Sequence, residues 1–454
     1  MSDFLMIESG PTSFHLDLKV AKRMLKLKSA LFFKFPFVTS ALIFAFVSSY
    51  PAQSKIDPFA LYLTGKPPLV IRVLSDKNVR SARVTQIVFY SRMENTKSRS
   101  ARSEIYAVIA RPNDNKRYPG LLVLHGGQGT AEIEKAIAWA ERGYVVVAPD
   151  LPGIAAPEKI PFSQGAWKAK TPDNYITASP DVTASPIFDA VLAAVQSLYL
   201  LRSQPNAIKE KIGVIGYAWG GYAATMVCGL TGSNVSAAFS VFGTGFYDVG
   251  SHWQVKLDRL PERDKTEWLR FLDAGRRASQ IKAHYFLATS TNHPYFWLTT
   301  AQATLGAIKD MKNQVFAPNA TTTIPLPGGT KPPGEPSLTW TEMEKSFFAY
   351  HLKGVGEPFP MVKLLAGFKF EEDVVRTRFR VEGAVTNVSA YYSSAPSAAN
   401  GHQWRKAVVS KVENEVYEAI IPIEAAREGS NWYALASSSH PATVSSVVAD
   451  VPKP

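Results

Sequence analysis

Gly216-Tyr217-Ala218-Trp219-Gly220-Gly221 follows the apolar run 212–215 in this chain of 454 residues. The spacing of the glycines matches the frame G-x-S-x-G of a nucleophile elbow. Such an elbow is a sharp strand-to-helix turn that exposes a serine hydroxyl at the top of a parallel sheet. Here Ala218 stands at the position of the serine. A methyl group cannot attack a carbonyl carbon, so the frame predicts a fold while the alanine argues against the usual reaction.

The sequence around this turn alternates between strand and helix patterns. Continuous apolar runs, such as 120–124 and 144–148, are typical of strands buried on both faces of a parallel sheet. The alternation predicts a doubly wound α/β sheet. The proline-rich segment 150–182 has the length of a lid or a rim. The expected strands are 69–74, 84–90, 105–110, 120–124, 144–148, 212–215, 237–242, 284–288 and 314–316, and the expected helices are 131–142, 186–201, one from Trp219 onward, 265–277, 298–309 and 340–352.

The pattern changes after Gly354, because short strands then follow one another without intervening helices. Short strands in series predict a small β-sandwich of the immunoglobulin or fibronectin-III type. We therefore expect an α/β domain over 55–358 and a β-sandwich domain over 359–454. The strands expected in the second domain are 377–381, 388–392, 417–421 and 432–435.

The N-terminal region has the order of a secretory signal peptide. Basic residues from Arg23 to Lys34 precede the apolar run 37–47, and a segment of mostly small residues, 48–54, follows. This order predicts export, with residues 1–54 as an N-terminal extension and a signal peptide cleaved near Ser54. The apolar run is shorter than the roughly 20 residues that a membrane helix needs, so we expect no stable span after cleavage. An uncleaved anchor is the alternative.

The composition describes a globular protein with a large core, since 46% of the residues are hydrophobic and 19% are charged. A single cysteine, Cys228, excludes an intramolecular disulfide framework. The histidines and carboxylates do not have the helical spacing of metal ligands, so we expect no catalytic metal. We also expect no cofactor. The net charge of +12 is compatible with anionic partners or with a basic solvated surface, and no basic-aromatic module indicates nucleic-acid binding.

A second motif lies about ninety residues before the turn. The strand 120–124 ends in His125-Gly126-Gly127, which resembles the H-G-G loop that supplies one backbone N–H of the oxyanion hole in α/β-hydrolases, while the N–H after the nucleophile supplies the other. Gly126, Gly127 and Trp219 would form this frame. The chain resembles more closely the secreted acetyl-xylan-esterase and dienelactone-hydrolase-like group. The resembling stretches are 118–127, 142–144, 148–153, 219–222, 246–248 and 272–277.

The resemblance implies a serine, an acid and a histidine, and none of them is present at its position. The serine falls on Ala218, the acid on His293 and the histidine on Thr322. Without these groups there is no acyl-enzyme, no proton acceptor and no carboxylate to orient the imidazole. Three departures favour natural degeneration over one engineered serine-to-alanine change. A re-invented active site is the remaining alternative.

Other groups offer weak substitutes. Cys228 lies in the helix after the turn, where a cysteine is usually a buried hydrophobe. Asp150 follows a strand and is expected to cap a loop or to form an ion pair. Asp248 could replace the acid of the triad, but it would have no catalytic base to orient. His293 is interpreted as an exposed loop histidine, with a lone general base as the alternative.

Aromatic residues on the loops above the sheet predict a ligand pocket, since such loops bind ligands in this fold class. The candidates are His125, Trp167, Tyr217, Tyr295 and Phe296. The leading hypothesis is a secreted or periplasmic, catalytically silent esterase homologue that binds a carbohydrate or a small ester, or that has a structural role. An active carboxylic-ester hydrolase acting on plant polysaccharide esters and an interaction scaffold are the alternatives.

Overall fold

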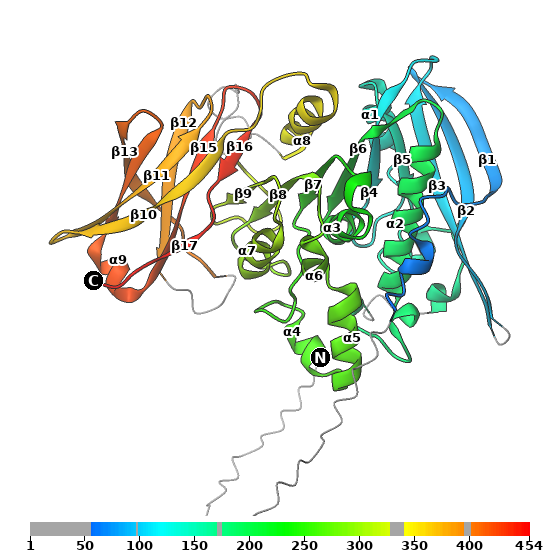
Figure 1. The fold of residues 1–454 in the computed structure, drawn as a ribbon, viewed down its shortest axis with the longest axis horizontal. Coiled ribbons are helices and arrows are strands. Elements are labelled where there is room, and N and C mark those ends of the chain that lie inside the picture. Colours follow the sequence, from blue (N-terminus) through cyan, green and yellow to red (C-terminus); the bar gives the residue numbers. More distant parts are fainter. Residues whose placement is uncertain (1–55, 97–98, 170–174, 327–339, 395–400) are drawn as a thin grey trace, which may run out of the picture. The chain divides into compact units, whose positions relative to one another are not determined.

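The computed structural model describes residues 56–96, 99–169, 175–326, 340–394 and 401–454, and residues 56–454 form one compact unit (Figure 1). The signal peptide and the extension expected over 1–54 lie outside the described residues. None of the described helices has the length and hydropathy that a bilayer crossing requires.

The first sheet has nine strands in the order β1-β2-β3-β5-β4-β6-β7-β8-β9. The first three strands form an antiparallel meander that pairs antiparallel with β5, and the strands from β5 to β9 are parallel. The doubly wound sheet is therefore confirmed, with an antiparallel edge. The strands are β1 (Val70–Val79), β2 (Ala82–Thr96), β3 (Arg99–Pro112), β4 (Tyr118–Leu124), β5 (Val145–Pro149), β6 (Ala207–Tyr217), β7 (Ala237–Val241), β8 (His284–Ser290) and β9 (Lys312–Ala317).

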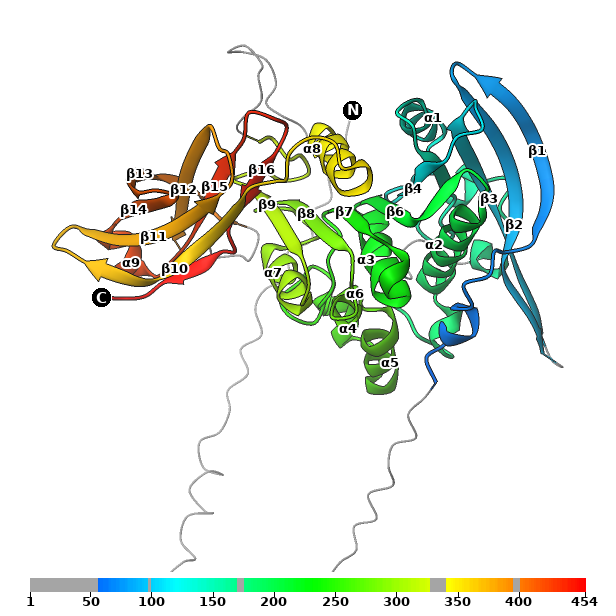
Figure 2. The same ribbon diagram turned by 45° about the horizontal axis from the view of Figure 1, so that its top comes forward.

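Helices cover both faces of this sheet. Figures 1 and 2 show α1 and α8 on one face and α2, α3 and α7 on the other. Every residue of β5 is buried, as a strand between two helical layers must be. The helices are α1 (Ile133–Glu141), α2 (Pro186–Ser203), α3 (Trp219–Thr231), α4 (Gln254–Asp258), α5 (Glu262–Leu272), α6 (Ala274–Ala278), α7 (Leu298–Ala307) and α8 (Trp340–Phe348), the last continued by a π-helical turn, Ala349–Lys353.

One expected helix is wrong. The continuous helix 265–277 is divided into α5 and α6 at Asp273, which has an extended backbone. Its buried carboxylate accepts hydrogen bonds from the backbone N–H groups of Phe246, Tyr247 and Arg276. Capping α6 while holding the 246–247 loop requires this break in the helix.

The C-terminal residues form an antiparallel, sandwich-like domain, in agreement with the fold class expected. Its strand order is β10-β11-β14-β13-β12-β15-β16, and β17 pairs with β15. The four expected strands are present within β11, β12, β14 and β15, while the short helix α9 (Ile423–Glu428) was not expected. The strands are β10 (Met361–Phe370), β11 (Val374–Glu382), β12 (Asn387–Ser394), β13 (Arg405–Glu413), β14 (Val416–Pro422), β15 (Ser430–Ser437), β16 (Thr443–Ser445) and β17 (Ala449–Val451).

Side chains connect the two sheets at β9 and at the loop after it. Gln314 donates from Nε2 to the carbonyl of Ser445 over 2.8 Å. The side-chain amide of Asn319 donates to the carbonyl of Trp404 over 2.8 Å, and the backbone N–H of Trp404 donates to Oδ1 of Asn319 over 2.7 Å. The loop that leads to Thr322 is thus attached to the C-terminal sheet.

Candidate functional site

The turn between β6 and α3 has the backbone of a nucleophile elbow. Ala218 has φ 51° and ψ −115°, a region that non-glycine residues rarely occupy. Its N–H donates to the carbonyl of Val241 over 2.8 Å, and its carbonyl accepts from the N–H of Tyr222 over 2.9 Å. These bonds hold the strained conformation. The turn therefore presents a methyl group where an elbow presents its nucleophile.

The glycines of the turn are required by close backbone contacts. A Cβ on Gly216 would lie 2.0 Å from the carbonyl oxygen of Gly220. A Cβ on Gly220 would lie 2.4 Å from the carbonyl oxygens of Leu124 and His125. Since neither contact leaves room for a side chain, the fold alone explains why both glycines are present.

The residues predicted to form an oxyanion frame lie together. Trp219 is the first residue of α3, so its backbone N–H has no acceptor within the helix. A Cβ on Gly127 would lie 3.3 Å from Cδ1 of Trp219, and a Cβ on Gly126 would lie 2.9 Å from Cδ1 of Tyr217. The loop after β4 and the elbow are thus in contact on either side of Ala218.

His125 connects two strand ends and does not line the cavity that contains Tyr217 and Thr322. The backbone N–H of Leu151 donates to its Nε2 over 2.9 Å, so the ring proton is on Nδ1, which lies 2.8 Å from the carbonyl oxygen of Gly126 and donates to it. The side chain is buried, and burial lowers its pKa to about 4. A neutral, fully hydrogen-bonded imidazole holds the ends of β4 and β5 in place.

His293, at the acid's position, is 4% exposed, so the expectation of an exposed loop histidine is wrong. The backbone N–H groups of Tyr295 and Phe296 both donate to its Nδ1 over 3.1 Å. The ring lies 4.3 Å from that of Phe242, and burial lowers the pKa of His293 to about 4. This neutral ring cannot replace a carboxylate, because its Nδ1 is already used as an acceptor.

Thr322, at the histidine's position, is exposed in the loop after β9. Its carbonyl oxygen lies 3.4 Å from the hydroxyl of Tyr217. The structure therefore brings position 322 to the elbow, but the side chain there is a hydroxyl without an imidazole.

The substitutes considered for catalysis are engaged elsewhere. Asp150 is buried and accepts from the N–H of Ala131 and the hydroxyl of Ser163. Burial raises its pKa to about 6 and that of the Cys228 thiol to about 12. The carboxylate of Asp248 forms two hydrogen bonds with the guanidinium of Arg276. Within the described ranges, no group of three or more metal-binding side chains occurs.

Aromatic rings fill the space on one side of the elbow. The ring of Trp219 lies 4.7 Å from Tyr175, 5.2 Å from Trp253 and 5.8 Å from Phe296, between ring centres. Phe296 is 2% exposed and therefore packs in the core here. Tyr295 is 46% exposed and stacks on Trp253 at the surface.

Trp167 is buried too, in a small cluster with Ala155 and Ile160 inside the segment expected to be a lid. Among the five residues predicted to line a pocket, Tyr217 alone lines the cavity beside the elbow. Of the other four, His125, Trp167 and Phe296 are buried in the fold, and Tyr295 lies at the surface away from this cavity.

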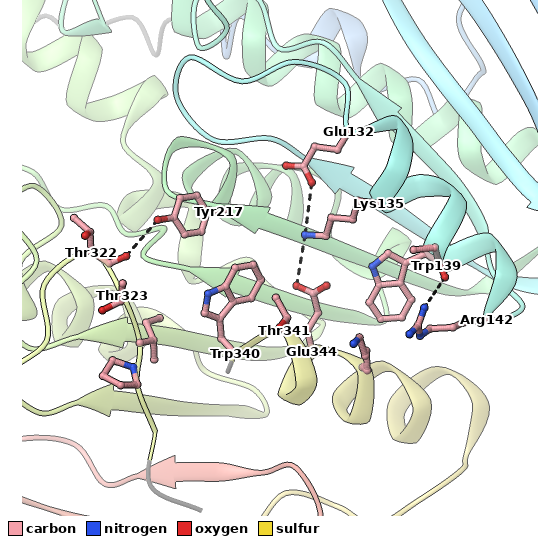
Figure 3. Close-up of a pocket in the computed structure, with 14 residues that line it drawn as sticks. Glu132, Lys135, Trp139, Arg142, Tyr217, Thr322, Thr323, Trp340, Thr341 and Glu344 are labelled. Carbon is pink, nitrogen blue, oxygen red and sulfur yellow. Dashed lines mark hydrogen bonds and ion pairs between the residues drawn. The ribbon is translucent and has the colours of Figure 1, made fainter. Parts of the chain in front are cut away.

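That cavity, which we call the elbow pocket, has a volume of about 730 Å³ and lies between α1, α8 and the loop after β9 (Figure 3). The rings of Tyr217 and Trp340 stack with their centres 5.8 Å apart. The residues that line the pocket are Glu132, Lys135, Ala138, Trp139, Arg142, Tyr217, Thr322, Thr323, Ile324, Pro325, Trp340, Thr341, Glu344 and Lys345.

Three of the charged groups of the elbow pocket form one cluster. Nζ of Lys135 lies 3.8 Å from Glu132 and 3.7 Å from Glu344, and it lies 5.4 Å from the ring centre of Trp340. Burial raises the pKa of Glu344, whose side chain is 2% exposed. Sequence reasoning missed Lys135, Trp340 and Glu344, because only the packing of α1 beside α8 brings them together.

Comparisons with known proteins agree with this architecture. Residues 105–264 match the model of the dienelactone hydrolase family. No curated protein matches the chain. The chain is similar to acetyl xylan esterase 1 from Thermoanaerobacterium sp., with 17% identity and a TM-score of 0.50 over 63% of this chain and 90% of that one.

Two further solved structures are similar at lower scores. An acetyl xylan esterase from Paenibacillus sp. has 18% identity and a TM-score of 0.46 over 58% of this chain and 86% of that one. A putative dienelactone hydrolase from Klebsiella pneumoniae has 14% identity and a TM-score of 0.35 over 52% of this chain and 87% of that one. The family match over 105–264 and the sheet order together show that this chain contains a dienelactone-hydrolase-family domain with the α/β-hydrolase fold.

Proposed function

We propose that this chain is an esterase-like α/β-hydrolase homologue without serine-hydrolase activity, and that it binds a carbohydrate or a small ester in the elbow pocket. The observation that carries the proposal is the methyl group of Ala218 on an otherwise complete elbow. Acyl transfer through such an elbow starts with attack by a hydroxyl or a thiol, and position 218 offers neither.

The surroundings of Ala218 support the loss of activity. A serine at 218 would need a proton acceptor, and Thr322 is not one. His293 is neutral, and its Nδ1 already accepts two backbone N–H groups. A serine introduced alone would thus have no proton acceptor at position 322 and no orienting carboxylate at position 293.

The lining of the elbow pocket supports the choice of ligand. The stacked rings of Tyr217 and Trp340 offer an apolar surface to a sugar ring or an acyl group. Glu132, Lys135 and Glu344 offer hydrogen-bond donors and acceptors beside that surface. Aromatic rings next to polar side chains can contact the apolar faces and the hydroxyl groups of a sugar at the same time.

We also propose that the protein acts outside the cytoplasm. This rests on the basic, apolar and small segments of residues 23–54. Mass spectrometry of the protein purified from its native host would test it. A mature chain that begins near residue 55 is expected, and an intact N-terminus in the cytoplasmic fraction would contradict export.

The test of inactivity is turnover of p-nitrophenyl acetate by three proteins. The natural chain and the variant Ala218→Ser should not exceed a heat-denatured control. Any gain should require the triple change Ala218→Ser, His293→Asp and Thr322→His, which supplies nucleophile, acid and base together. Clear turnover by the natural chain would overturn the proposal.

The test of binding is calorimetric titration with acetylated xylo-oligosaccharides. Trp340→Ala removes one of the two stacked rings and should weaken binding by about tenfold, near 1.4 kcal/mol. Phe162→Ala is the matched control, because Phe162 is a 47% exposed aromatic residue outside the elbow pocket. Equal affinity of the natural chain and Trp340→Ala would place the ligand elsewhere.

A further inference from the structure

A second cavity of about 740 Å³ lies at the amino ends of the parallel strands, whereas the elbow lies at their carboxyl ends. Its lining includes the first residues of β8 and β9, whereas Ala218 follows the last residue of the parallel strand β6. Since these strands are parallel, the cavity and the elbow lie at opposite ends of the strands. The π-helical turn after α8 and the start of β10 complete its walls. We call it the distal pocket.

The interior of the distal pocket is apolar. The ring of Phe359 lies 5.3 Å from that of Phe286 and 5.8 Å from that of Phe347, between ring centres. Two methionines at its edge are accessible, with Met311 61% and Met361 41% exposed. Methionine side chains adapt to apolar ligands of irregular shape. Such a wall favours a ligand with a sizeable hydrocarbon body.

Two imidazoles form part of the same wall. The rings of His284 and His351 lie 4.3 Å apart, and His351 lies 4.4 Å from the ring of Phe347. Burial lowers the pKa of both histidines, that of His351 to about 4, so both are neutral at pH 7. Neutral imidazoles can accept or donate one hydrogen bond each without adding charge to the cavity.

The charges that line the distal pocket are mostly positive. Lys282, Lys309 and Lys312 line it, against the single carboxylate of Asp310. Lys282 is paired with Asp310 over 2.9 Å, and Nζ of Lys312 donates to the carbonyls of Leu305 and Ile308. For Lys309 the described part of the chain shows no ion pair. Its exposed ammonium group is therefore available to an anion.

We propose that the distal pocket binds an amphipathic organic anion, whose apolar body lies against Phe286, Phe347 and Phe359 and whose acidic group lies near Lys309. The apolar wall favours a ligand with a hydrocarbon body, and the excess of ammonium groups favours a ligand with a negative charge. This site is separate from the elbow pocket and does not depend on the function proposed for it.

Two fluorescent probes test the proposal, because they share the same apolar body and differ by one sulfonate group. 1-Anilinonaphthalene-8-sulfonate carries a sulfonate on an apolar aromatic body, and N-phenyl-1-naphthylamine is its neutral counterpart. The natural chain should bind the sulfonate at one site. Lys309→Glu should weaken its binding by about tenfold, since the substitution reverses a charge close to the sulfonate, and should leave the neutral probe within about twofold.

Two further variants locate the probe. Lys77→Glu is the matched control, because Lys77 is an exposed lysine on β1 at the other end of the sheet order, and it should leave both affinities unchanged. His351→Trp should fill the cavity and abolish binding of both probes. Equal effects of Lys309→Glu and Lys77→Glu, or equal loss of both probes in Lys309→Glu, would overturn the proposal even if His351→Trp failed to fold.

Discussion

Nζ of Lys135 in α1 lies 3.7 Å from Oε2 of Glu344 in α8, and this ion pair joins the two helices on one face of the α/β sheet. The carboxylate is buried, and among the described residues its ion pair is with Lys135. Lys135→Met would leave the carboxylate without that partner. We expect a loss of about 2 kcal/mol in the free energy of unfolding, measured by urea denaturation.

The control for this loss is Lys345→Met, which removes a lysine from α8, the helix of Glu344, and should change stability by less than about 0.5 kcal/mol. The double variant Lys135→Met with Glu344→Gln should recover most of the loss, because no buried charge remains unpaired. Equal stability of Lys135→Met and the natural chain would show that the pair contributes nothing.

The contact between position 216 and the carbonyl of Gly220 makes Gly216→Ala severely destabilising. The new methyl would lie 2.0 Å from a backbone oxygen that cannot move without opening the elbow. We expect a loss of more than about 3 kcal/mol, or insoluble protein. Gly306→Ala in α7 is the control, since nothing lies within 4 Å of its added methyl. This control should raise the unfolding free energy by about 0.5–1 kcal/mol, and a similar result for Gly216→Ala would refute the steric argument.

The positive φ of Ala218 predicts how that position tolerates other side chains. Valine is branched at Cβ and should lose about 1–3 kcal/mol at φ 51°, whereas glycine adopts this region freely and should match or exceed the natural stability. Thermal unfolding of Ala218→Val and Ala218→Gly measures both effects. A valine variant as stable as the glycine variant would mean that the elbow relaxes in solution.

The buried histidines predict acid sensitivity. His125 and His293 have pKa values near 4 in the folded chain, below the ordinary 6.5 of the unfolded chain. Between these values the unfolded chain binds more protons, so stability is fully present above about pH 6.5 and is lost as the pH falls toward 4. Each histidine would account for about 3 kcal/mol over that interval.

His293→Asn tests this prediction, because the amide oxygen can accept the N–H groups of Tyr295 and Phe296 without titrating. Urea unfolding at pH 7 and at pH 4.5 should show a smaller difference for the variant than for the natural chain. An unchanged difference would mean that His293 does not contribute to the acid transition.

Much of the fold could be predicted because its signals are local. The glycine frame around Ala218 and the apolar run of β4 each indicate their structure within a few residues. The break at Asp273 could not be predicted in the same way, since it depends on N–H groups of the 246–247 loop. Local periodicity contains no information about such a partner.

The site was predictable at the elbow and not beyond it. The positions of Gly127 and Trp219 follow from two motifs, and the structure places them in contact. The elbow pocket depends on Lys135 and Glu344, which are far apart in the sequence and meet through the packing of two helices. The burial of His293 likewise results from the surrounding Phe242 and Phe296 rings, which its loop sequence does not reveal.

The reciprocal hydrogen bonds between Asn319 and Trp404 have a mechanical consequence. A pull on the C-terminal sheet reaches Asn319 directly, and only two residues separate Asn319 from Thr322 on the wall of the elbow pocket. A load applied at that sheet would therefore act on the pocket wall through Asn319 at the same time as it acts on the parallel strand β9 through Gln314.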